Sequence, residues 1–353
     1  MNRIYRLIWN AAAAQWVPAW ELARSARRGR ARTRLLAACV LGSALSVTGL
    51  GLAYAAPQGG QIITGSGQVT QAGNTTTVQQ SSQNLALNWQ SFNVGANETV
   101  NFVQPNASAI AVNRILGNGG SSILGHVNAN GQVWLINPNG ILFGKGSQVN
   151  VGGLVATTLD TDAAGFSATS KTFGGSGTGN VTTQGTINAT GGGYVALLGN
   201  SVSNEGVISA QLGTIALGAG SAATLTFSHN RLLQVQIDNS TLNNVAANRG
   251  LMAADGGTVL MTAGAKNSLL ASSVNNSGVI RANSVENHNG TIVLVAGEQA
   301  GQVNVGGSVQ AASTDGSGGT VIATAKEVSV LDGAHIDVNG GSGGGAIDIG
   351  GGW

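Results

Sequence analysis

The side chains that could do acid–base or metal chemistry are few and scattered along the chain. A zinc site needs several histidine or cysteine ligands at short, regular spacing. No pair of histidines has that spacing, and Cys39 is the only cysteine. The pairs Asp160/Asp162 and Asp332/Asp337 are better explained as exposed turn residues than as catalytic acids. The histidines are His126, His229, His288 and His335.

Two glycine-rich segments match catalytic or binding motifs only in part. Residues 340–344 fit the pattern Gly-x-Ser-x-Gly of a nucleophile elbow, but no strand–elbow–helix context surrounds them. The same tract lacks the aspartate of the calcium-binding repeat Gly-Gly-x-Gly-x-Asp. Residues 144–146, Gly-Lys-Gly, lack the Ser or Thr and the spacing of a phosphate loop. We therefore expect a non-enzymatic protein with no metal and no cofactor.

The composition indicates a β protein with many turns. Charged residues make up 8% of the 353 residues, and there are 56 glycines but only 4 prolines. Disordered chains are normally rich in charge and proline, and glycine is unfavourable inside helices. Val, Ile, Leu and Ala are therefore expected to form the core of short strands, which glycine and asparagine corners connect.

The positive charge is confined to an N-terminal leader. Residues 1–56 contain eight arginines and one glutamate, a net charge of +7. The remaining residues contain eight basic and thirteen acidic side chains, a net charge of −5. The chain after the leader therefore offers no basic surface to a nucleic acid.

The leader has the pattern of an extended signal peptide. Arginines precede an apolar run over 35–53, and Ala53-Tyr54-Ala55 is a small-x-small cleavage site before Ala56. An ordinary signal peptide spans roughly 15–30 residues, and this leader is about twice as long. A transmembrane anchor is the alternative, since about 18 apolar residues can span a bilayer. Glycines and serines within the run favour cleavage, and a chain that begins at Ala56 contains no cysteine and no disulfide.

Two short patterns recur after residue 180, and each is a run of alternating apolar residues that begins with glycine. One is Gly-Thr-Ile-Asn-Ala with its variants, and the other is Gly-Thr-Val-Leu-Met-Thr-Ala with its variants. Such strands, separated by glycine or asparagine corners, predict a parallel β-solenoid whose coils bury Val, Ile and Leu by stacking. Copies of the first pattern begin at Gly185, Gly206 and Gly278, and copies of the second at Gly257, Gly290 and Gly319.

One earlier stretch has unusually strong turn signals. Two apolar runs, 133–136 and 141–143, flank the tetrad Asn137-Pro138-Asn139-Gly140. Proline presets φ at the first central turn position, and the Asn137 side chain can hydrogen-bond its own backbone two residues on. Asn139 and Gly140 tolerate the left-handed conformation. The stretch therefore predicts a strand, a tight turn and a second strand.

This part of the chain resembles the secretion domain of two-partner secretion exoproteins, the filamentous haemagglutinin and high-molecular-weight adhesin group of Gram-negative bacteria. The resemblance covers about residues 61–160. It implies an all-β fold, a right-handed parallel β-helix (solenoid) with an N-terminal β cap and short hairpin excursions. The matching segments are 88–94 (NWQSFNV), 111–115 (AVNRI), 122–125 (SILG) and 130–140 (NGQVWLINPNG).

The resemblance also implies a route of export. The chain would cross the inner membrane through the Sec translocon and be recognised by the periplasmic POTRA domains of a TpsB-type outer-membrane β-barrel transporter. It would then be exported unfolded and serve adhesion at a host or bacterial cell surface, through a glycan or protein receptor. The residues that the resemblance implies for transporter recognition or for the turn are Asn137, Pro138, Asn139, Gly140, Asn113 and Arg114.

We expect three regions: a signal peptide over 1–55, a secretion domain with cap and first coils over 56–179, and further coils over 180–353 that continue past Trp353. The alternative function is the secretion domain of a contact-dependent toxin, haemolysin or haem-carrier exoprotein whose active part lies downstream. A periplasmic or phage-type sugar-binding solenoid shares the fold but would not explain the long leader or the tetrad. Irregular excursions from the solenoid are expected over 160–179 and 225–248.

Overall fold

The computed structural model describes residues 5–10, 15–20, 56–161, 169–228 and 231–351. Every regular element in these ranges is a β-strand. In the part of the chain that the structure describes, no helix is long and apolar enough to cross a membrane.

The chain divides into two units, Met1–Gly51 and Leu52–Trp353. In the first unit, β1 (Tyr5–Asn10) and β2 (Gln15–Trp20) pair antiparallel. The sequence pattern indicated a leader here but did not predict this strand pair.

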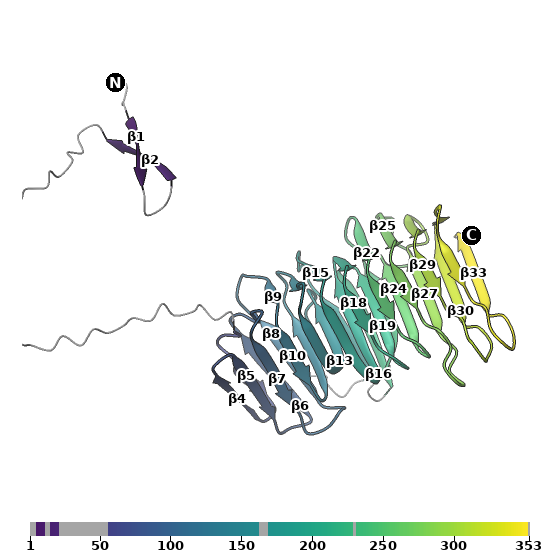
Figure 1. Ribbon diagram of the computed structural model, residues 1–353, viewed down its shortest axis with the longest axis horizontal. Helices are drawn as coiled ribbons and strands as arrows, with labels where there is room; N and C mark the ends of the chain where they lie inside the picture. Colours follow the sequence, from purple (N-terminus) through teal and green to yellow (C-terminus); the bar gives the residue numbers. More distant parts are fainter. Residues whose placement is uncertain (1–4, 11–14, 21–55, 162–168, 229–230, 352–353) are drawn as a thin grey trace, which may run out of the picture. The chain divides into compact units, whose positions relative to one another are not determined.

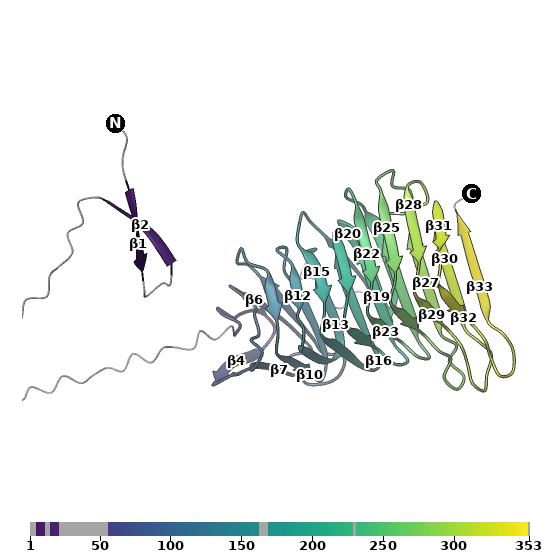
Figure 2. The ribbon, with the colours of Figure 1, turned by 45° about the horizontal axis from the view of Figure 1, so that its top comes forward.

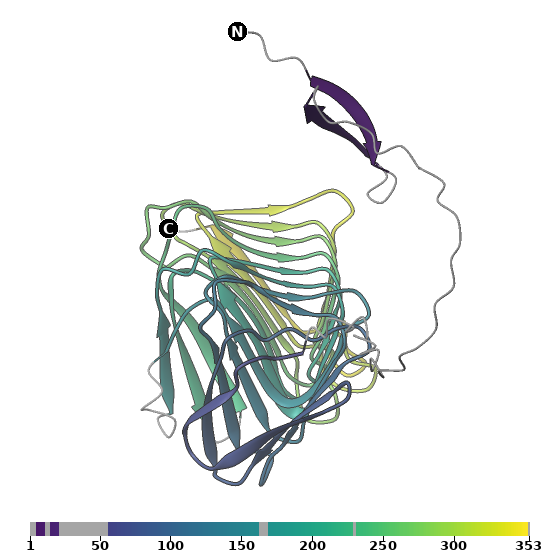
Figure 3. The ribbon, with the colours of Figure 1, turned by 90° about the vertical axis from the view of Figure 1, so that its left-hand side faces the viewer.

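The second unit is a parallel β-helix. Successive coils stack along one axis, and a complete coil contributes one strand to each of three parallel ladders (Figure 1). Figure 2 shows the stack tilted forward, and Figure 3 looks along it. The all-β solenoid predicted from the sequence is confirmed.

Neighbouring strands within each of the three ladders run parallel. Two long strands, β13 and β16, pass through a corner of the coil and belong to two ladders. The first ladder contains β5 (Thr75–Gln80), β7 (Thr99–Val103), β10 (His126–Ala129), β13 (Gln148–Thr157), β16 (Thr186–Gly199), β18 (Val207–Ser209), β23 (Leu251–Ala253), β26 (Val279–Arg281), β29 (Ser308–Gln310) and β32 (His335–Asp337). The second contains β6 (Asn84–Trp89), β8 (Ile110–Ile115), β11 (Gln132–Ile136), β13 and β16 again, β19 (Thr214–Ala219), β24 (Thr258–Ala263), β27 (Thr291–Ala296), β30 (Thr320–Ala325) and β33 (Ala346–Gly351). The third contains β9 (Ser121–Ile123), β12 (Ile141–Phe143), β15 (Asn180–Thr183), β17 (Ser201–Asn204), β22 (Asn244–Asn248), β25 (Ser272–Asn276), β28 (Gly301–Val305) and β31 (Glu327–Val330).

The inward side chains of the ladders form one continuous core. Ile187 pairs in register with Ile208, and both are fully buried, as the repeat pattern predicts. The structure adds a copy that the pattern missed, because Met252 takes the isoleucine position between Ile208 and Ile280. Stacking of like positions from coil to coil removes these side chains from water, which is the main stabilising contribution in such a fold.

An antiparallel cap covers the N-terminal end of the stack. β3 (Gln61–Thr64) pairs with β6, and β4 (Gly67–Ala72) pairs with β5, both antiparallel. β5 and β6 then begin the parallel ladders by pairing with β7 and β8. The cap protects strand edges that would otherwise be open to another chain.

A three-stranded antiparallel sheet, the side sheet, lies outside the coils. It contains β14 (Ser170–Gly174), β20 (Ala222–Ser228) and β21 (Arg231–Asn239), in this order. Its apolar side chains pack on the outward side chains of the second ladder and form a second core. Both predicted excursions contribute strands to this sheet, but β20 begins at Ala222, three residues before the expected start of the second excursion. The expectation that the second excursion reaches residue 248 is wrong, because β22 has already rejoined the third ladder.

Candidate transporter-recognition segment

The tetrad 137–140 forms the corner between β11 and β12. These strands belong to different ladders, so the tetrad turns the chain from one face of the coil to the next and closes no hairpin. The Gly140 N–H donates to the Asn137 carbonyl at 3.0 Å. The Asn139 N–H donates to Asn137 Oδ1, also at 3.0 Å. This last bond is the local side-chain contact that the sequence predicts.

Asn137 is fully buried, and it connects three coils. Its Nδ2 donates to the Gly119 carbonyl at 3.0 Å and to Ser121 Oγ at 2.9 Å, both in the preceding coil. Its backbone N–H donates to the Thr157 carbonyl, in the following coil, at 2.9 Å. Loss of a buried amide leaves such partners unsatisfied, so Asn137 stabilises the folded corner. In the folded chain its side chain is inaccessible to another protein.

The exposed part of the tetrad is its tip. Asn139 is exposed and Pro138 is half-buried. Asn139 Nδ2 donates to the Gly117 carbonyl at 2.9 Å. Gly140 is buried with φ of 108°, where other residues are strained, and a Cβ there would lie 3.1 Å from the Asn180 carbonyl oxygen. Of the four residues, only Pro138 and Asn139 present side chains to solvent.

Asn113 and Arg114 lie on β8, one strand away from the tetrad. Arg114 pairs in register with Ile136, the residue before Asn137. Asn113 points inward and is fully buried, and its Oδ1 accepts from Trp89 Nε1 at 2.9 Å. Its role in the folded chain is to satisfy the buried indole of Trp89.

Arg114 points outward and holds the start of the first excursion. Its Nη2 lies 2.8 Å from Asp160 Oδ1, and its Nε donates to the same oxygen at 2.9 Å. A further bond runs from Arg114 Nη2 to the Thr161 carbonyl. The Asp160 side chain is 53% exposed, so this ion pair contributes little to stability. Asp162 lies outside the described residues.

Three buried polar side chains form a row of hydrogen bonds beneath the side sheet, and this row was not predicted from the sequence. Trp134 Nε1 donates to the Tyr194 hydroxyl at 2.9 Å, and that hydroxyl donates to Gln132 Oε1 at 2.6 Å. Burial raises the pKa of the Tyr194 phenol above its ordinary value, while its hydrogen bond with Trp134 acts in the opposite direction. The phenol is therefore held neutral.

The side sheet covers this row of polar side chains with two phenylalanines. The ring centroids of Phe173 and Phe227 lie 5.7 Å and 6.0 Å from that of Trp134. The alternation Ala223, Leu225, Phe227 along β20 is a sequence signal that could have predicted a strand with one face packed inward. Nothing in that alternation identified Trp134 as the partner, since about ninety residues separate the two.

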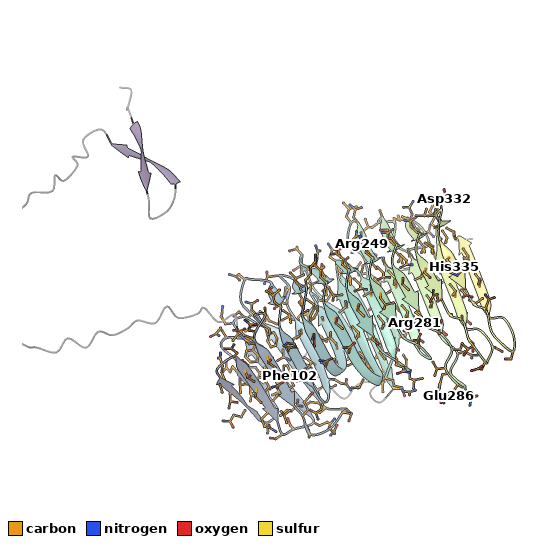
Figure 4. The ribbon with its side chains drawn as sticks, in the orientation of Figure 1. Phe102, Arg249, Arg281, Glu286, Asp332 and His335 are labelled. Atoms are coloured by element: carbon orange, nitrogen blue, oxygen red, sulfur yellow. The ribbon has the colours of Figure 1, made fainter. Side chains whose placement is uncertain are left out.

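The groups that could bind a metal or do acid–base chemistry stay apart. Within the described ranges, no three His, Cys, Asp or Glu side chains lie close enough to hold a metal ion. Of the acidic residues labelled in Figure 4, Glu286 lies at the lower edge of the stack and Asp332 at the upper edge. His229 and Cys39 lie outside the described residues.

Two family models match this chain. The model of the TPS secretion domain matches residues 53–344, and that of the extended signal peptide of the type V secretion system matches residues 1–50. The chain belongs to the TPS secretion domain family. It is the secretion domain of a secreted exoprotein that crosses the inner membrane with an extended signal peptide. The two matches together imply export through the Sec system and a TpsB outer-membrane transporter as partner.

Two solved secretion domains resemble the structure. The HMW1 secretion domain from Haemophilus influenzae is 32% identical, with a TM-score of 0.71 over 80% of this chain and 74% of that one. The filamentous hemagglutinin secretion domain has a TM-score of 0.57 over 84% of this chain and 99% of that one. At 18% identity, the second match supports the fold alone.

Curated relatives extend far beyond the length of this chain. A heme/hemopexin-binding protein of Haemophilus influenzae is 36% identical over 194 residues. That match covers 52% of this chain but 21% of the relative, so it spans about a fifth of the relative's length.

The cleavage motif falls at the edge of the described structure. Ala53 and Ala55 lie outside the described residues. Ala56 is buried, and its carbonyl accepts a hydrogen bond from Gln58 Nε2 at 2.9 Å. Cleavage before Ala56 stays a prediction.

Proposed function

We propose that the transporter's POTRA domains read the segment that contains Asn113, Arg114 and the tetrad 137–140 while this segment is still unfolded. The observation that carries the proposal is the burial of Asn113 and Asn137, each hydrogen-bonded inside the folded coil. Side chains that are inaccessible after folding can be recognised only before it.

The same hydrogen bonds provide a way to release the transporter. Nδ2 of Asn137 can serve either a partner protein or Gly119 and Ser121, but not both. Folding of the corner would therefore remove the recognised groups from the transporter. Parallel strand pairing is slow to form, which leaves time for export before these bonds are made.

The test compares export with stability across matched asparagine variants. Asn137→Ala and Asn139→Ala are expected to reduce the amount exported by a cell that carries the partner transporter. Asn248→Ala is the control, because Asn248 is fully buried and its Nδ2 donates to Asn276 Oδ1 at 2.8 Å, far along the stack. If export of all three variants simply follows the melting temperature, the recognition role is wrong and the tetrad is only a corner.

The exoprotein served by this domain is proposed to act in adhesion at a host or bacterial cell surface. This rests on the resemblance to the high-molecular-weight adhesin group and on the likeness to the HMW1 secretion domain. Binding of the full-length secreted protein to epithelial or bacterial cells, with and without glycan removal, tests it.

A haem-related exoprotein is the second candidate, because the curated relative at 36% identity is named a heme/hemopexin-binding protein. Spectroscopic titration of the full-length protein with haem, and capture of hemopexin, distinguish this candidate from the adhesin. An adhesin is expected to bind neither ligand.

A further inference from the structure

The outward face of the second ladder carries no charge over three consecutive strands. Alternation along β24, β27 and β30 places threonine and aliphatic side chains outward, and all are half-buried within the sheet. A flat, uncharged face rich in β-branched residues is suited to packing against another β-sheet layer. These residues, called the threonine face below, are Thr258, Leu260, Thr262, Thr291, Val293, Val295, Thr320, Ile322 and Thr324.

On the preceding coils, the same ladder is already covered by the side sheet. β21 lies along β19: Thr214 Oγ1 donates to the Leu232 carbonyl at 2.7 Å. At the other end of β19, a Cβ added to Gly218 would lie 3.3 Å from the Ile237 side chain and 3.4 Å from Val235. β21 therefore runs in the same direction as β19 and directly above it.

The free edge of β21 faces the threonine face. β20 pairs with one edge of β21, and β14 follows beyond it, with Phe173 above Trp134 of β11. Among the described residues, no strand pairs with the other edge of β21. That edge points toward β24, whose Leu260 already packs against the second core. Neighbouring strands lie about 4.8 Å apart, so a strand added to β21 would lie above β24.

We propose that the free edge of β21 and the threonine face together form a strand-addition site for an extended segment of another protein. The segment would pair through its backbone with β21 and place every second side chain on Leu260 and Val293. Since the face holds no charge, those side chains have to be apolar or threonine-like, while the opposite face of the segment stays polar. Open strand edges beside an apolar surface are a recurrent mode of peptide recognition.

A synthetic peptide with the sequence of β20, Ala222–Ser228, is a suitable probe. It has the required alternation, with Ala223, Leu225 and Phe227 on one face, and β21 already pairs with this sequence on its other edge. The fluorescently labelled peptide is expected to bind the secreted protein saturably in an anisotropy titration. Backbone amides of β21 are expected to gain protection from hydrogen exchange when the peptide binds.

Two lysine substitutions make a matched pair of variants. Val293→Lys places a charge on the threonine face and is expected to weaken peptide binding by about tenfold or more, because the charge would be buried without a partner. Ser329→Lys places the same charge outward on β31 in the third ladder and is expected to leave binding unchanged. Melting temperatures of both variants equal to that of the wild-type protein would show that folding is unaffected.

Three results would overturn the proposal. The first is no binding by the wild-type protein, and the second is equal binding by both lysine variants. The third is self-association of the wild-type protein that Val293→Lys abolishes without any peptide protection of β21, because the threonine face would then serve a second copy of the chain.

Discussion

Buried side-chain amides hold the corners of this solenoid together. Asn137 bonds across coils at the tetrad, and Asn204, Asn248 and Asn276 form a ladder of amides inside another corner. Each amide provides both donor and acceptor, so it can satisfy backbone groups that a turn leaves unpaired. Asparagine is therefore a structural residue here before it is a recognition residue.

The alternation of residues along β8 places Asn113 on the inward face of the strand, whereas its polar side chain would ordinarily be expected to face solvent. Ala111, Asn113 and Ile115 share one face of β8, and all three are buried. A polar residue within an inward pattern needs a buried partner, and that partner, Trp89, lies 24 residues away. The partner could not be predicted because it depends on the register between coils.

Asn113→Ala should reduce the free energy of unfolding by about 1–3 kcal/mol, since the Trp89 indole then has no acceptor. Urea unfolding of the secreted domain measures this change. Asn150→Ala removes an exposed side-chain amide on the outward face of the first ladder, and a change within about 0.5 kcal/mol is expected. A loss for Asn113→Ala as small as the control would contradict the structural role.

Because of Tyr194, the folding stability of the domain is expected to fall at alkaline pH. It is the only tyrosine after residue 55. Burial raises its pKa in the folded chain, so above about pH 10 the unfolded chain releases a proton that the folded chain keeps. The unfolded state then binds fewer protons, and stability falls as pH rises, by about 1.4 kcal/mol per pH unit.

This prediction is checked by urea unfolding between pH 8 and pH 11, and by phenolate absorbance, which should appear only on unfolding. Tyr194→Phe should lower stability at neutral pH, because Gln132 and Trp134 lose a partner, but should remove the tyrosine share of the alkaline slope. Phenolate absorbance in the folded protein near pH 10 would contradict the account.

Among the strands, the repeated patterns made the coils of the solenoid predictable. The side sheet lies outside these repeats, so its strand pairing could not be predicted. The glycine-led patterns give the inward face directly, since each copy stacks on the next. The side sheet brings β14 to β20 across about fifty residues, and no repeat indicates that pairing. The alternation within β20 could have indicated that one of its faces is buried, but residues 225–248 were expected to be irregular.

Ile187→Asp should destabilise the domain by several kcal/mol, about 3 or more, because it places an unpaired charge in the stacked core. Asn188→Asp is the matched control, since this neighbouring side chain points outward. Circular dichroism with urea unfolding measures both variants. Similar, small effects would show that the inward assignment of the repeat is wrong.

In the whole molecule, the second core packs together two regions that were expected to be separate, residues 56–179 and residues 180–353. Trp134 and Phe173 precede the expected boundary at residues 179 and 180, whereas Tyr194 and Phe227 follow it. The division stays a prediction, but packing connects both sides of it. The match to the TPS secretion domain model likewise continues to residue 344.

The mature chain should begin at Ala56 or within a residue or two of it. Ala56 is buried at the start of the described second unit, which places the cleavage motif immediately before the folded structure. N-terminal sequencing of the secreted protein checks this. Recovery of protein that retains Arg24 to Arg34 would favour a membrane anchor.

The most direct test of the central claim, that recognition precedes folding, is the binding of the purified POTRA region of the partner transporter to folded and unfolded forms of this chain. The folded wild-type domain and the destabilised Ile187→Asp variant provide the two states without changing the tetrad, when both are compared at one urea concentration that unfolds only the variant. If recognition precedes folding, the POTRA region binds the unfolded variant at least about tenfold more tightly, and Asn137→Ala in that variant removes the difference. Equal affinity for the folded wild-type domain would show that the transporter does not require an unfolded chain.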